Sequence, residues 1–231
     1  NSEIPYTFAE QMGLAVVRMP YVLDDEEYYY DLGKNTDFKH FYERERAGSM
    51  PSTAALNEQN YIDIYEPYLA AGTDILMISF SSALSGTHES LESARVKLLE
   101  KYPERTFMVV NTLSISMGAG LLVYYSTLLW KQGKSMQEVY GFVEQTRQHV
   151  HHWFTVDDLN HLKRGGRLSG AAAFMGTLLE LKPVITLNSE GKLIVAEKAK
   201  GRKRSLKALA DKLAQNIERS KVQVVVVLHA D

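Results

Sequence analysis

The sequence predicts an α/β fold that contains parallel strands. Residues 74–80 (DILMISF) and 106–111 (TFMVVN) are short, continuous apolar runs, as expected of strands buried on both faces. Each run is followed by a stretch with helical periodicity, 88–102 and 117–133. This alternation is typical of a parallel sheet covered by helices. The length of 231 residues suits one large domain or two small ones.

The residues before this alternation predict a strand, an edge segment and two helices. Residues 14–23 are rich in valine and predict a strand, and EEYYYDLG after them predicts a turn or a short edge strand. Residues 36–48 carry aromatic residues at helical spacing, with Gly48 as the stop. Residues 49–72 predict a loop and then a helix, with Ser52 as the N-cap and Gly72 as the stop.

Helices dominate the next part of the chain. The helix at 88–102 places four residues on one face, and they are Leu91, Ala94, Leu98 and Tyr102. After the strand at 106–111, residues 117–133 and 135–153 predict two consecutive helices.

The pattern changes near residue 153, so we predict two domains, 1–152 and 153–231. Residues 155–166 predict a helix with a capping box, in which Thr155 caps and Asp158 reaches back. A second helix is expected at 171–181, a β-hairpin at 183–199 with its turn near 189–191, and an amphipathic helix at 203–220. Residues 222–229 predict a buried strand.

Composition excludes several classes of protein. The chain has no cysteine, which rules out disulfides, thiolate zinc sites and a cysteine nucleophile and fits a reducing compartment. No apolar run reaches the roughly 18 residues of a membrane span, and the first residues do not resemble a signal peptide. We expect a cytoplasmic protein without integral membrane association, and we interpret its start, which lacks Met, as a processing boundary.

The charge is uneven along the chain. Residues 153–231 carry 14 Lys and Arg against 8 Asp and Glu, and the rest carries 12 against 20. Two ordinary solvated surfaces, or a basic half that faces an anionic partner, would each produce this pattern. A nucleic-acid partner is not expected, because the basic residues are not interleaved with aromatic ones. The spacing of His149, His151 and His152 does not predict a metal site.

Residues 81–87 (SSALSGT), here called the serine-rich loop, join the strand at 74–80 to the helix at 88–102. Ligands collect at the carboxyl ends of parallel strands, and a helix N-terminus offers unpaired N–H groups and partial positive charge. Gly86 would let the backbone approach a ligand, and the loop has four hydroxyls, on Ser81, Ser82, Ser85 and Thr87. The loop therefore predicts a seat for a carboxylate or phosphate.

The same residues are also compatible with a purely structural role. Ser85 and Thr87 would then cap the helix, and Ser81 and Ser82 would form a polar turn. The loop lacks the spacing and lysine of a P-loop and the G-x-S-x-G of a serine hydrolase. A second polar loop at 48–52 (GSMPS) precedes a predicted helix, and it is either part of the same site or a proline-containing turn.

Five motifs occur in the order found in DegV-family proteins, which the whole chain resembles. They are GSMPS, SSALSGTHESLESA, LKRGGRLSG, LELKPVITLNSEGKL and KGRKRSLKAL. The resemblance implies a two-domain α/β fold, with a parallel-sheet N-terminal domain, a mixed α/β C-terminal domain and a long-chain fatty acid between them. It also implies a carrier, not an enzyme, that presents the fatty acid to a fatty acid kinase in bacterial phospholipid synthesis. No cofactor, metal or catalytic residue is implied.

The resemblance also implies which residues contact the ligand. The carboxylate would bind Ser49, Ser81, Ser82, Ser85, Gly86 and Thr87. Gly48 stands where the family usually has threonine, which leaves Ser49 as the donor of its loop. The acyl tail would lie in a tunnel, because burial stabilises it by roughly 0.8 kcal/mol per methylene. Candidates for the tunnel wall are Phe80, Leu84, Met117, Phe174, Met175 and Leu178, and ordinary core packing is the alternative for each.

The basic motifs are expected to face the kinase. The motif Lys163–Arg167 and the run Gly201–Arg204 match basic elements of the family, and we expect Arg167, Arg202 and Arg204 to face the kinase or its nucleotide phosphates. A cation at a helix C-terminus, or a solvated loop, is the alternative.

The chain departs from the family pattern in two further respects. Asn111 and Thr112 stand where Asp-Ser is usual, which weakens any role that needs a carboxylate there. Both ends look truncated, the C-terminal domain included, so no head-group histidine can be named. A second hypothesis from the residues is an α/β enzyme that acts on a small phosphorylated or carboxylated metabolite, with Ser81 or Ser82 as a contact.

Overall fold

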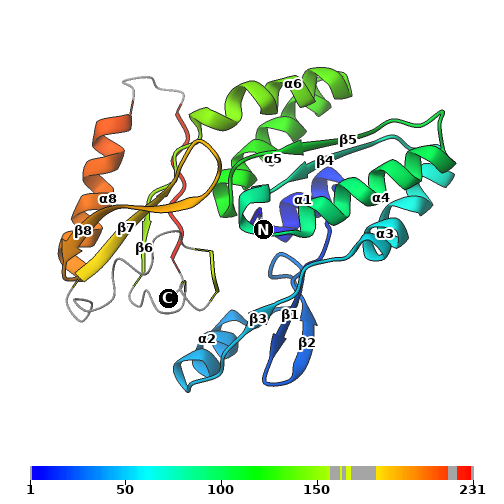
Figure 1. Ribbon diagram of the computed structural model, residues 1–231. Helices are drawn as coiled ribbons and strands as arrows, with labels where there is room; N and C mark the ends of the chain where they lie inside the picture. The colour runs from blue at the N-terminus through cyan, green and yellow to red at the C-terminus, as the bar shows by residue number, and fades with distance from the viewer. Residues whose placement is uncertain (1, 157–161, 163–164, 168–180, 218–222, 230–231) are drawn as a thin grey trace. The chain divides into compact units, whose positions relative to one another are not determined.

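The computed structural model describes residues 2–156, 162, 165–167, 181–217 and 223–229. It divides into two compact units, Asn1–Arg147 and Gln148–His229 (Figure 1). The boundary that the sequence predicts, after residue 152, lies within the second unit, and the two domains stay a prediction. Both units combine helices with a sheet, and the first contains a parallel strand pair, so the predicted α/β class is confirmed.

The centre of the first unit is the parallel pair β4 (Ile75–Ser79) and β5 (Phe107–Asn111). Ile75 is opposite Phe107 and Ser79 is opposite Asn111, so both strands end at the same edge. The helices α4 (Thr87–Lys101) and α6 (Met136–Thr146) both contact β5 and lie on opposite sides of the pair in Figure 1. This is the strand and helix alternation that the sequence predicts.

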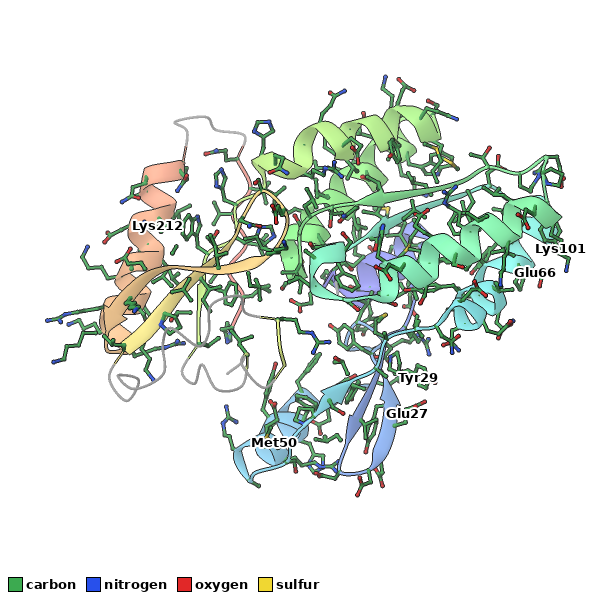
Figure 2. All side chains as sticks on the ribbon, viewed as in Figure 1. Glu27, Tyr29, Met50, Glu66, Lys101 and Lys212 are labelled. Carbon is green, nitrogen blue, oxygen red and sulfur yellow. The ribbon has the colours of Figure 1, made fainter. Side chains whose placement is uncertain are left out.

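Helix α4 packs against α3 (Glu58–Ala70) through the face expected from the sequence. Leu91, Ala94 and Leu98 are fully or almost fully buried. They belong to one core cluster with five other buried residues, which are Leu56, Tyr61, Tyr65, Leu69 and Phe107. At the rim, Lys101 of α4 forms an ion pair with Glu66 of α3, and Figure 2 shows both at the outer end of these helices.

Two helices follow β5, as predicted, but the second is shorter than expected. Helix α5 spans Ser116–Lys131. Helix α6 ends at Thr146, and the rest of the predicted helix at 135–153 is a 3₁₀ turn (Arg147–His149) followed by residues 150–153, which form no regular structure. Ser135 caps α6 in a capping box with Glu138. Lys134 and the Ser135 donors hold the pKa of Glu138 down at about 2, which keeps this carboxylate charged near the positive helix end.

A small antiparallel sheet, ordered β2-β1-β3, lies before the parallel pair in sequence. Its strands are β1 (Pro20–Leu23), β2 (Glu26–Tyr29) and β3 (Ser52–Thr53), and α2 (Phe38–Arg46) follows β2. Tyr21 stacks on Tyr28 and meets Phe41 edge-on, which ties the sheet to α2. The predicted edge strand and the helix at 36–48 are confirmed, but the strand predicted at 14–23 begins only at Pro20.

Two other predictions for this region are wrong or incomplete. Ser52 does not cap α3, because it is paired with Val22 in β3. Asn57 caps α3 instead, since its side chain accepts from the Asn60 N–H and the Asn60 side chain accepts in return. Helix α1 (Tyr6–Met12), which ends at a left-handed Gly13, was not predicted.

The N-terminal segment passes directly over α5 at Gly120. A Cβ at this position would lie 2.2 Å from the carbonyl oxygen of Ser2 and 3.2 Å from Cγ2 of Ile4. Glycine is therefore required for this approach. It allows Ile4 to be almost fully buried, in a cluster with Ala9 and Leu32.

The second unit is an antiparallel sheet, ordered β6-β7-β8, with a helix after it. Its elements are β6 (Phe154–Thr155), β7 (Leu181–Leu187), β8 (Leu193–Lys200) and α8 (Arg202–Asn216). The predicted hairpin and the helix at 203–220 are confirmed, the latter to Asn216. In the hairpin turn, Asn188 Oδ1 accepts from the N–H groups of Glu190 and Lys192.

Other predictions for the second half fail or lie outside the described residues. Thr155, the predicted helix cap, pairs with Val184 in β6. Asp158, most of the helix predicted at 155–166 and nearly all of that at 171–181 lie outside the described residues. Residues 223–229 form no regular structure, and all of them are exposed. The exposed fraction of Val227 is 82%. The predicted buried strand is wrong there, since no described strand pairs with it.

Within the described ranges, every helix is too short or too polar to cross a membrane.

Candidate ligand-binding loops at the end of the parallel strands

The serine-rich loop leaves the edge where β4 and β5 end. It begins with a 3₁₀ turn (Ser82–Leu84), and α4 starts at Thr87. The loop after β5 lies beside it, because the Ser81 N–H donates to the carbonyl of Ser114 at 2.8 Å. The predicted position of the serine-rich loop, between a parallel strand and a helix, is confirmed.

Asn111, the last residue of β5, connects the two loops. Its Oδ1 accepts from the N–H of Leu113 at 3.0 Å and from that of Ser82 at 3.3 Å. Its Nδ2 donates to Ser82 Oγ at 2.7 Å. Its backbone carbonyl accepts from Arg147 Nη1 at 2.7 Å, and this guanidinium also pairs with Glu144.

Three serines of the serine-rich loop accept hydrogen bonds. Ser81 is fully buried, and its Oγ accepts from the Ala83 N–H at 3.3 Å. Ser85 Oγ accepts from the Thr87 N–H at the same distance. Ser82 is half-buried, and its Oγ accepts from Asn111. These bonds fix the hydroxyl oxygens in place, and they do not consume the protons of Ser82 and Ser85. They fit the polar turn of the structural alternative, but its capping prediction is wrong, because Gly86 is the N-cap of α4 and not Ser85 or Thr87.

Thr87 differs from these serines because its hydroxyl is directed into the core. It is 2% exposed and lies 2.9 Å from the hydroxyl of Tyr61. It also donates to the carbonyl of Leu56 at 3.2 Å. Burial raises the pKa of Tyr61 above its ordinary value, so the phenol stays protonated. Thr87 therefore links α4 to the segment before α3.

Gly86 is the N-cap of α4 and has ordinary right-handed backbone angles. A Cβ there would meet no atom within 4 Å. The fold itself does not require glycine at this position, so the predicted close approach of a ligand remains an expectation.

Ser49 lies before β3 and is held at the turn between β1 and β2. Its hydroxyl donates to Asp24 Oδ2 at 2.9 Å, and Arg44 Nε donates to the same oxygen at 2.9 Å. The hydrogen bond from Arg44 is the main cause, and that from Ser49 the second, that holds the pKa of Asp24 below its ordinary value. The Ser49 proton is thus directed to a carboxylate of the chain itself, and the described residues show no hydrogen bond between Ser49 and the serine-rich loop.

The predicted tunnel residues are only partly described. Leu84 is 7% exposed and Phe80 is half-buried. Met117 packs against the cluster around Ile4, as in the alternative of ordinary core packing. Phe174, Met175 and Leu178 lie outside the described residues.

The predicted kinase-facing arginines are exposed where described. Arg167 follows Gly166, and its Nη1 donates to the carbonyl of Gly165. Arg202 and Arg204 lie in the first turn of α8. Lys163 and Arg164 of the same motif lie outside the described residues.

Sequence reasoning missed Asn111 as a contributor and did not consider Ser114. Ser114 is fully buried, and its Oγ has no hydrogen-bonding partner among the described residues. A polar residue at the last position of a buried strand was the available signal for Asn111. The hydroxyls of Ser82 and Ser85 at this edge are donors of the kind that an anionic head group needs.

A family model and two curated relatives identify the family of this chain. The DegV family model matches residues 1–231. A DegV domain-containing protein of Clostridium perfringens is 40% identical over all of this chain and 79% of its own length. A Streptococcus pyogenes relative of the same description is 32% identical over 97% of this chain and 78% of its own.

Solved structures extend the likeness to the fold. A fatty-acid-binding DegV family protein from Thermus thermophilus is 30% identical, with a TM-score of 0.78 over 93% of this chain and 74% of that chain. The Streptococcus pneumoniae fatty acid kinase (Fak) B3 protein, loaded with linoleic acid, is 25% identical. Its TM-score is 0.74, over 87% of this chain and 70% of that chain. The chain described here belongs to the DegV family.

Proposed function

We propose that this chain binds a long-chain fatty acid, with its carboxylate on the serine-rich loop, and presents it to a fatty acid kinase that forms the acyl phosphate. The observation that carries the proposal is the likeness to the Thermus thermophilus fatty-acid-binding protein over 93% of this chain. The kinase partner is supported by the likeness to the pneumococcal Fak B3 protein. In this proposal the chain is a carrier, and the partner supplies the nucleotide chemistry.

The contacts of the loop select the head-group donors. Ser82 and Ser85 keep their protons, because each oxygen accepts a hydrogen bond from an N–H group. Ser81 holds the turn beside them. We leave Thr87 and Ser49 out of the donor set, because their hydroxyls contact the core and Asp24 respectively. A buried carboxylate needs such donors, since burying a charge without partners is costly.

The lipid-binding step is tested on the purified protein and on the double variant Ser81→Ala with Ser82→Ala. We expect mass spectrometry of a denatured sample to find a long-chain fatty acid at one per chain. The double variant should bind added oleate at least about tenfold more weakly, the cost of losing one hydrogen bond to a charged group. An exposed serine of the hairpin turn, Ser189→Ala, is the control.

The enzyme hypothesis makes a different prediction for this experiment. A site without lipid, together with turnover of a small phosphorylated compound in the absence of a kinase, would replace the carrier proposal. Undiminished uptake of oleate by the double variant would remove Ser82 from the proposed head-group donors.

The presentation step is tested with Arg167→Ala in an assay with a fatty acid kinase and ATP. Arg167 is exposed, and a guanidinium recognises phosphate or carboxylate through paired hydrogen bonds. We expect acyl-phosphate formation to be lost while oleate binding is retained. The control is Lys192→Ala, which removes another exposed cation of the second unit. Turnover equal to that of the control would contradict a role for Arg167.

A further inference from the structure

The two loops at the ends of the parallel strands have no charged residue of their own. Residues 79–87 and 111–118 contain no Asp, Glu, Lys or Arg, and all of them except Ala83 and Gly86 are buried or half-buried. Taking the charge of a carboxylate out of water is costly, even where hydroxyls donate to it. A positive charge from another part of the chain would lower this cost.

Arg147 brings a positive charge to the end of β5. Its Nη1 donates to the carbonyl of Asn111, the last residue of the strand, at 2.7 Å. Asn111 also contacts Ser82 Oγ at 2.7 Å. These two bonds and the length of one asparagine place Arg147 Nη1 within about 11 Å of Ser82 Oγ. The Arg147 side chain is 23% exposed, so salt screens its charge less than that of a surface cation.

Glu144 compensates part of this charge. Its carboxylate lies three residues earlier in the chain and 2.7 Å from Arg147 Nη1. Within the described part of the chain, Arg147 bonds to the end of β5, whereas no hydrogen bond joins Glu144 to either loop. Removing one partner or the other therefore changes the charge beside the strand ends in opposite directions.

We propose that Arg147 is a specificity-determining residue, whose positive charge favours an anionic head group over a neutral one at the ends of β4 and β5. The inference rests on the proposed function and adds to it a residue outside the serine-rich loop. Hydroxyls can bond to an acid and to an alcohol alike, whereas a charge distinguishes the two. Arg147 thus sets the preference for a fatty acid over its alcohol.

The variants Arg147→Gln and Glu144→Gln test this with opposite expected results. Arg147→Gln removes the cation, so we expect the affinity for oleate to fall roughly threefold to tenfold, as for a charge at this distance inside a protein. Glu144→Gln leaves the cation without its partner, so the affinity for oleate should rise roughly twofold to fivefold. The affinity for oleyl alcohol should stay within about twofold in both. Displacement of a fluorescent lipid measures both ligands.

A third variant, Arg147→Lys, keeps the charge and loses the shape of the guanidinium. It should retain most of the preference for oleate over oleyl alcohol. If it loses this preference together with Arg147→Gln, charge is not the cause and the inference is wrong. Should Arg147→Gln not fold, the rise in oleate affinity expected of Glu144→Gln decides the question, because that variant keeps the bond to β5.

The matched controls are Lys101→Gln and Glu66→Gln, which make the same two changes of charge elsewhere. These residues also form an ion pair, at the outer end of α3 and α4 (Figure 2). Lys101 is the last residue of α4 and lies about 20 Å along the helix from its first residue, Thr87. Salt screens exposed charges at such a distance, so neither control should alter the preference for oleate.

The outcomes separate this inference from the proposed function. If the unmodified protein fails to bind oleate, the proposed function is wrong, and this inference fails with it. If the protein binds oleate but Arg147→Gln weakens oleate and oleyl alcohol equally, Arg147 only supports the Asn111 carbonyl, and the carrier function stands without the inference. A preference lowered by Arg147→Gln, raised by Glu144→Gln and unchanged in both controls supports it.

Discussion

Replacing Leu91 by alanine is expected to lower the free energy of unfolding by about 2–5 kcal/mol, the usual cost of a Leu→Ala cavity in a packed core. Leu91 of α4 is completely buried, in a cluster with residues of α3 and with Phe107 of β5. Urea denaturation followed by circular dichroism measures the change. Val96→Ala is the control, because Val96 lies on the same helix and is 49% exposed.

The result matters for the site because Thr87, the last residue of the serine-rich loop, is the first residue of α4. Val96→Ala should change the free energy of unfolding by no more than about 0.5 kcal/mol, as for other surface substitutions. A Leu91→Ala variant as stable as the control would contradict the assignment of this face to the core.

The second large effect is expected from Thr87→Val, which removes one hydroxyl and keeps the shape. The Tyr61 hydroxyl and the Leu56 carbonyl would each lose a partner in the core. A buried polar group left without a partner costs about 1–3 kcal/mol, so we expect a loss of stability in this range or above it. Thr53→Val, on an exposed strand position, is the control.

A double-mutant cycle with Tyr61→Phe identifies the source of this loss. If the two hydroxyls form a pair, the second substitution costs less than it does alone, because it removes a group that is already without a partner. Oleate binding distinguishes the structural from the ligand-binding interpretation. Reduced oleate binding at unchanged stability would return Thr87 to the head-group donors that the sequence predicted.

Periodic apolar patterns explain why the centre of the first unit was predictable. The spacing of Leu91, Ala94 and Leu98 determines which face of α4 is buried. The continuous apolar runs identified β4 and β5 and, with them, the position of the serine-rich loop. Motif order then indicated the family, which the comparisons confirm.

Predictions based on composition or on one capping residue were less successful. Ser52 and Asn57 are both good N-caps, and only pairing with β1 decides that Ser52 belongs to a strand. Valine content predicted strands at 14–23 and 222–229, but a strand also needs a partner. Among the described residues, only Pro20–Leu23 of these segments finds one.

The direction of hydroxyl groups could not be read from the sequence. Ser82, Ser85 and Thr87 are three hydroxyl residues of the same loop, and the sequence does not distinguish their roles. In the structure, the Thr87 hydroxyl points into the core, whereas those of Ser82 and Ser85 lie at the strand ends. Asn111 looked like a lost carboxylate, whereas its amide supports two N–H groups and one hydroxyl. Such roles depend on contacts between loops that are distant in sequence.

Gly120 limits how this protein can vary over evolution. Any side chain at this position would collide with the Ser2 carbonyl while Ile4 remains seated on α5. Another residue at position 120 is therefore compatible with this fold only if the segment from Ser2 to Ile4 moves as well. Drift at this position is coupled to the N-terminal residues, although more than a hundred positions separate them.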